Sequence, residues 1–91
     1  MDLSSRVWEI LAADASTAVL HRGRVFIRAI VFTDYVNGTD NFVVQDGNGK
    51  TVFSGNGNSD LSPVELTSIE TPIQGLIVPT LATGRLLIYI M

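Results

Sequence analysis

The chain has 91 residues, of which 46% are hydrophobic and only 16% are charged, and its formal net charge is -3. A chain of this length predicts a single domain spanning residues 1–91. The acidic balance argues against nucleic acid as a partner, because binding it normally needs a basic patch. The absence of cysteine excludes disulfides and thiolate metal sites.

The termini and apolar runs give no sign of a membrane protein. The chain begins Met1-Asp2 without a basic region followed by an apolar one, so we expect no signal peptide. The longest uncharged run, Thr71 to Gly84, is too short to span a bilayer and contains two prolines. We therefore expect a soluble protein that is made in a cytoplasm and has no membrane partner.

The first segment fits two kinds of secondary structure. Leu3, Val7 and Ile10 recur at helical spacing, whereas a strand would place Trp8 and Ile10 on one face. We favour the strand because every later segment has β character.

Residues Arg24 to Phe32 give the clearest strand pattern. One face would carry Val25, Ile27, Ala29 and Val31, and the other Phe26, Arg28, Ile30 and Phe32. A turn is predicted just before this strand at Arg22-Gly23, which would leave His21 exposed beside it.

The middle of the chain is rich in turn signals. Asn37-Gly38 predicts a type I′ hairpin turn, since both residues tolerate positive φ. Asp46 to Gly49 predicts a second turn, joining strands Asp40–Gln45 and Lys50–Ser54 into a β-hairpin.

The C-terminal part adds three strand patterns, at Val64–Thr67, Ile73–Val78 and Leu86–Met91. In total about eight short runs separated by turns predict an all-β fold, a single antiparallel β-sandwich. The pairing order stays open between a jelly roll and a simpler Greek-key sandwich.

Candidate chemistry is sparse, and we expect no enzyme. His21 is the only histidine, and no oriented nucleophile and base accompany it. Asp34 and Asp40 flank the Asn37-Gly38 turn, where acids usually accept hydrogen bonds from nearby backbone N–H groups. No catalytic or cofactor-binding residue is predicted.

One loop resembles a calcium-binding sequence without completing it. Asn56, Asn58 and Asp60 have the spacing of the first three ligands, but Leu61 and Thr67 replace the glycine and glutamate that the motif needs. We therefore predict no metal site. Tyr35 is the one aromatic residue that we expect near solvent.

Two strand patterns are apolar on both faces, which predicts a homo-oligomer. Leu86, Ile88 and Ile90 would lie on one face of the last strand, opposite Leu87, Tyr89 and Met91. A chain this short cannot cover both faces, and an open apolar patch of that size is rare on monomers. The candidate interface residues are Phe26, Ile30, Phe32, Leu87, Tyr89 and Met91.

The order and spacing of the strands and turns also resemble those of a known family. Segments Asp46–Phe53, Pro72–Leu81, Gly84–Ile90 and, upstream, Gly23–Ile27 resemble short β-sandwich virion proteins of tailed bacteriophages. The resemblance implies a capsid decoration or cement protein on the exterior of the virion, which binds and stabilises the assembled lattice of major capsid protein. It also implies a trimer, by analogy with capsid symmetry axes. The alternative is a tail or baseplate β-module, or a carbohydrate-binding attachment module.

Overall fold

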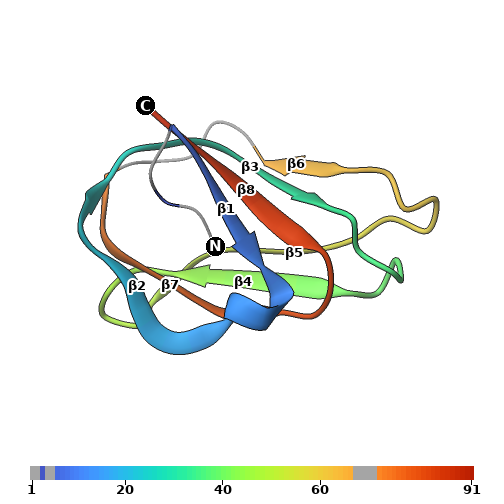
Figure 1. Ribbon diagram of the computed structural model, residues 1–91, viewed down its shortest axis with the longest axis horizontal. Coiled ribbons are helices and arrows are strands. Elements are labelled where there is room, and N and C mark those ends of the chain that lie inside the picture. The colour runs from blue at the N-terminus through green and yellow to red at the C-terminus, as the bar shows by residue number, and fades with distance from the viewer. Residues whose placement is uncertain (1–2, 4–5, 67–71) are drawn as a thin grey trace.

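The computed structural model describes residues 3, 6–66 and 72–91, and strands dominate it (Figure 1). The strands are β1 (Val7–Leu11), β2 (Ser16–Val25), β3 (Ile27–Thr33), β4 (Asn41–Gln45), β5 (Thr51–Asn56), β6 (Val64–Leu66), β7 (Ile73–Leu81) and β8 (Arg85–Ile90). A 3₁₀ turn, Ala12–Asp14, follows β1. The all-β prediction with about eight strands is confirmed, and the first segment is a strand. No helix in the described ranges is long and apolar enough to cross a membrane.

The strands form two four-stranded sheets, in the orders β1-β8-β3-β6 and β2-β7-β4-β5. All neighbouring strands are antiparallel. The pairing is nested: the first strand lies beside the last, β2 beside β7, β3 beside β6, and β4 beside β5. This is the order of a jelly roll, so the strand order decides between the two sandwich topologies that the sequence leaves open.

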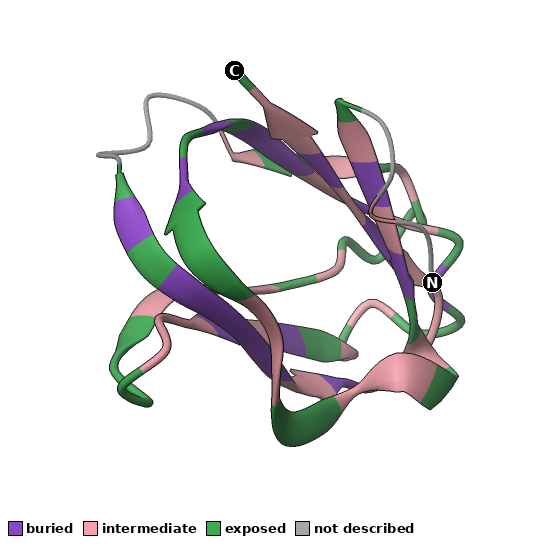
Figure 2. Ribbon diagram, turned by 60° about the vertical axis from the view of Figure 1, so that its left-hand side comes forward, coloured by how far each residue is buried: buried purple, intermediate pink, exposed green. Residues whose placement is uncertain are grey.

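The core lies between the two sheets, which both contribute buried apolar side chains. Figure 2 shows buried residues on the strands of both sheets. The β1-β8-β3-β6 sheet contributes Trp8, Ile10, Ile27, Ile30, Phe32, Leu86 and Ile88, and the opposite sheet contributes Val25, Phe42, Val44, Ile73, Leu76, Val78 and Leu81. Completely burying side chains of this size is worth roughly 1.5–3 kcal/mol each, so this interior is the main source of stability.

The segment predicted as one strand, Arg24–Phe32, is divided by a corner. β2 ends at Val25 in one sheet and β3 begins at Ile27 in the other, while Phe26 stays 43% exposed between them. A second irregularity follows at Arg28. Ile27 pairs with Ile90 and Ala29 with Tyr89, so one extra residue is inserted in β3. This β-bulge reverses the alternation, and it turns Ile30 into the core instead of outward.

Two predicted turns are also different in the structure. Arg22-Gly23 lies inside β2, and His21 packs its ring against Trp8, with ring centroids 4.9 Å apart. Asn37 and Gly38 both have negative φ, so no type I′ turn forms there. Their loop carries the chain from β3 in one sheet to β4 in the other and therefore does not join hairpin strands.

The second predicted hairpin is confirmed, with β4 and β5 paired around Asp46 to Gly49. Asp46 Oδ1 accepts hydrogen bonds from the backbone N–H groups of Asn48 and Lys50. The turn then folds over β7, where the Gly47 N–H donates to the Gln74 carbonyl at 2.8 Å. A Cβ on Gly75 would lie 2.7 Å from the Gly47 Cα, so this contact requires glycine.

Candidate binding face

The outer surface of the β1-β8-β3-β6 sheet carries an unusual number of apolar side chains. We call it the outer face. By strand register its residues are Val7, Glu9, Leu11, Ala29, Val31, Thr33, Glu65, Arg85, Leu87 and Tyr89, and Arg28 at the bulge lines the same side. Leu11 is 40% exposed, and Val7, Val31, Leu87 and Tyr89 are partly buried. A sandwich normally shows polar side chains on its outward surfaces, so an apolar outer face indicates a contact surface.

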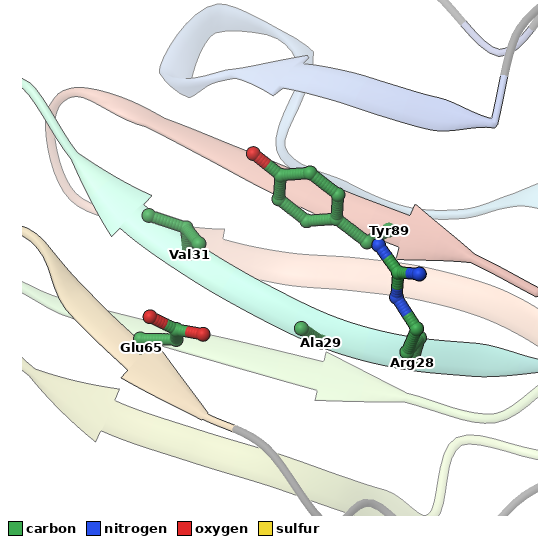
Figure 3. A pocket seen from close by; sticks show the side chains of 5 residues that line it. All are labelled: Arg28, Ala29, Val31, Glu65 and Tyr89. Carbon is green, nitrogen blue, oxygen red and sulfur yellow. The ribbon is translucent and has the colours of Figure 1, made fainter.

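A depression of about 350 Å³ lies in this face (Figure 3). Arg28, Ala29 and Val31 of β3, Glu65 of β6 and Tyr89 of β8 line it. Its floor is low because Ala29 has only a methyl group opposite the ring of Tyr89. The volume is at the lower end of the range of small-molecule sites.

An ion-pair cluster bounds one end of the outer face. Arg85 Nη1 lies 2.6 Å from Glu9 Oε2, and Arg85 Nε lies 2.7 Å from Asp34 Oδ2. The hydrogen bond to Glu9, followed by the charge of Asp34, raises the pKa of Arg85. The cluster is partly exposed, and such pairs contribute little to stability.

The predicted interface residues separate into three groups. Leu87 and Tyr89 lie on the outer face as expected from the alternation in the last strand. Phe26 and Met91 are exposed at the corner between the sheets, where the Met91 N–H donates to the Phe26 carbonyl at 2.9 Å. Ile30 and Phe32 are 0% exposed, so their assignment to the interface is wrong. The bulge at Arg28 turns both side chains into the core.

Sequence reasoning missed the two charged residues that line the depression, Arg28 and Glu65. Arg28 is the only charged residue between Val25 and Phe32, and Glu65 stands between Val64 and Leu66. An isolated charge within an apolar strand was the available signal for each. The bulge in β3 and the pairing of β3 with β6 place Arg28, Ala29 and Glu65 on one face.

The loop with calcium-like spacing is held together by its own hydrogen bonds. Asp60 Oδ1 accepts from the Ser62 hydroxyl at 2.9 Å and from its backbone N–H, and Asn58 Nδ2 donates to Ser62 Oγ. The Ser62 hydroxyl, then its N–H, holds the pKa of Asp60 below the ordinary value. No group of three or more histidine, cysteine or acidic side chains within residues 3, 6–66 and 72–91 is placed to hold a metal ion.

Tyr35 anchors this loop, and its predicted exposure is wrong. The side chain is 4% exposed and stacks on Phe32. Its hydroxyl accepts a hydrogen bond from the Asn58 N–H at 2.7 Å and donates one to the Ser62 carbonyl. Asp40 caps the preceding loop as expected, accepting hydrogen bonds from the Val36 and Asn37 N–H groups.

Comparison of the chain with protein-family models, with curated proteins and with solved structures finds no match in any of the three.

Proposed function

We propose that this protein is a structural module that works by protein–protein contact through its outer face and has no catalytic activity. The observation that carries the proposal is the open apolar surface of the β1-β8-β3-β6 sheet, with a depression between β8 and the edge strand β6. The loop aspartates also support the proposed absence of catalysis. The carboxylates of Asp40, Asp46 and Asp60 each accept hydrogen bonds from nearby backbone N–H groups.

The setting that we propose is a virion, with the protein as a capsid decoration or cement protein. The support for this proposal is that the order and spacing of the strands and turns resemble those of small phage virion proteins. The jelly roll recurs in viral capsid and lectin domains, which is a fold-level analogy only.

The energetics of the outer face suit a repeated lattice. Its apolar side chains are already partly covered, so burying each would contribute about 1 kcal/mol, or half the value for full burial. Such contacts are weak for one copy, and they become strong only when copies linked to one another bind neighbouring sites of a lattice. Each bound copy would stabilise the assembled state by mass action.

The test is co-sedimentation of the purified protein with particles from its source that have been stripped of it. We expect Leu87→Asp to abolish binding, because it places a charge within the apolar surface. Ser54→Asp is the matched control, since Ser54 is exposed on β5 in the opposite sheet. Binding to free capsid subunits equal to that on particles, or equal binding by both variants, contradicts the proposal.

A carbohydrate-binding attachment module is the second candidate, and the depression is the observation that favours it. The ring of Tyr89 and the guanidinium of Arg28 lie on one side of the depression, and the carboxylate of Glu65 lies across β3 from them (Figure 3). Sugars stack on aromatic rings. Their hydroxyl groups accept hydrogen bonds from a guanidinium group and donate them to a carboxylate. Glycan-array binding that Tyr89→Ala removes would favour this candidate over the first.

A further inference from the structure

Two opposite charges on the outer face have no partner among the described residues. Arg28 and Glu65 are both exposed, and neither makes an ion pair or a side-chain hydrogen bond within residues 3, 6–66 and 72–91. Arg85 of the same sheet, by contrast, is paired with Glu9 and with Asp34, which directly follows β3. Arg28 and Glu65 are therefore free to pair with groups outside the chain.

These two charges lie on either side of Ala29. Figure 3 shows Arg28 and Glu65 on opposite sides of Ala29, at either side of the depression. Ala29 is 9% exposed and forms the low point between them. A surface with a positive group on one side of a point and a negative group on the other is complementary to itself when two copies meet face to face.

We propose that the outer face binds a second copy of this chain about a two-fold axis that lies parallel to the sheet and passes over Ala29. In this arrangement Arg28 of each copy faces Glu65 of the other across the axis, and the two depressions over Ala29 face each other. Two-fold interfaces of this kind use the same patch twice and are the commonest in homo-oligomers. The inference rests on the proposed function, because it keeps protein–protein contact through the outer face. The same face cannot bind a lattice and a second copy at once, so the dimer and the lattice-bound form would be alternative states.

The size of the face predicts a weak dimer. Four strands spaced by about 4.8 Å span about 19 Å, and five residues of a strand span about 17 Å. The resulting footprint of about 320 Å² is less than half of the roughly 800 Å² that each partner buries in a standard interface. We therefore expect association in the high micromolar range, which raised salt weakens because the two charge pairs lie at the rim.

The test is charge reversal measured by analytical ultracentrifugation between about 10 µM and about 1 mM, a range that brackets weak association. The wild-type chain should approach the mass of a dimer. Arg28→Glu and Glu65→Arg should each weaken association more than about tenfold, because each places two like charges opposite each other. Lys50→Glu is the control, since Lys50 is exposed in the turn region of the opposite sheet, and it should behave as the wild type.

Mixing the variants distinguishes contact between copies from an effect within one copy. In an equimolar mixture of Arg28→Glu and Glu65→Arg, both cross-pairs are again of opposite charge, so the mixed dimer should form as well as the wild-type one. The double variant should also recover. Failure of the mixture to associate, a monomer mass throughout the range, or the mass of a trimer would each overturn the two-fold pairing.

The outcome is separable from that of the proposed function. A monomer that still binds particles through Leu87 would overturn the pairing and leave the structural role intact. A dimer that the charge reversals disrupt, but that does not bind particles, would support the pairing and contradict the role in a virion.

Discussion

Removing the hydroxyl of Tyr35 tests whether this buried side chain holds the 57–62 loop to the sandwich. Tyr35→Phe keeps the ring, which stacks on Phe32 with centroids 4.7 Å apart. It deprives the Asn58 N–H and the Ser62 carbonyl of their shared partner. A typical intramolecular hydrogen bond contributes about 0.5–1.5 kcal/mol net, so losing two should lower the free energy of unfolding by about 1–3 kcal/mol.

The assay is thermal and urea-induced unfolding of the wild-type chain and the variant. For a domain of this size, 1 kcal/mol shifts the melting temperature by about 4–8 °C, so a loss near 2 kcal/mol corresponds to a fall of about 8–16 °C. Amide hydrogen exchange at Asn58 should accelerate in the variant, since this N–H donates to the Tyr35 hydroxyl.

Tyr89→Phe is the matched control for this change. The Tyr89 side chain is partly exposed, and its hydroxyl makes no hydrogen bond within the described residues. Its removal should change the free energy of unfolding by less than about 0.5 kcal/mol. If Tyr35→Phe is no more destabilising than Tyr89→Phe, the hydroxyl does not hold the loop and the reasoning is refuted.

Two further perturbations test the turn over β7 and the loop before β4. Gly75→Ala should destabilise by more than Gly49→Ala in chemical denaturation: both residues have φ near +84°, but only at Gly75 does a Cβ meet backbone, at 2.7 Å from the Gly47 Cα. Equal losses would show that backbone conformation alone matters. The Thr83 hydroxyl and then the Asn37 N–H hold the pKa of Asp40 below its ordinary value of 3.8. Because the unfolded chain binds this proton more readily, stability from Asp40 is present above that value and is lost as pH falls below it. Denaturation midpoints measured on both sides of that pH should change less in Asp40→Asn than in the wild type, and an unchanged pH dependence would contradict this role.

The sequence by itself determined the local elements of this protein. The turn residues Asp46 to Gly49 predicted the hairpin of β4 and β5, and it forms as expected. The alternation in the last strand predicted that Leu86 and Ile88 share one face and Leu87 and Tyr89 the other, and the structure confirms this. These features depend on neighbours in the chain, because turn conformation and side-chain alternation are set over a few residues.

Part of the candidate face was also accessible in this way. Leu87 and Tyr89 were predicted from the double-sided apolar pattern of their strand. Arg28 and Glu65 were not, since each belongs to the face through strand pairing that joins β3 to β6 across more than thirty positions of the chain.

Only the tertiary structure decided the corner at Phe26, the bulge at Arg28 and the burial of Tyr35. An unbroken alternation placed Ile30 and Phe32 outward, whereas the inserted residue in β3 turned them into the core. Tyr35 follows the end of β3 beside residues that favour turns, yet its hydroxyl finds partners at Asn58 and Ser62. The physical reason is the same in each case: the jelly roll pairs strands from opposite ends of the chain, so which side chains are covered depends on groups that local sequence does not bring together.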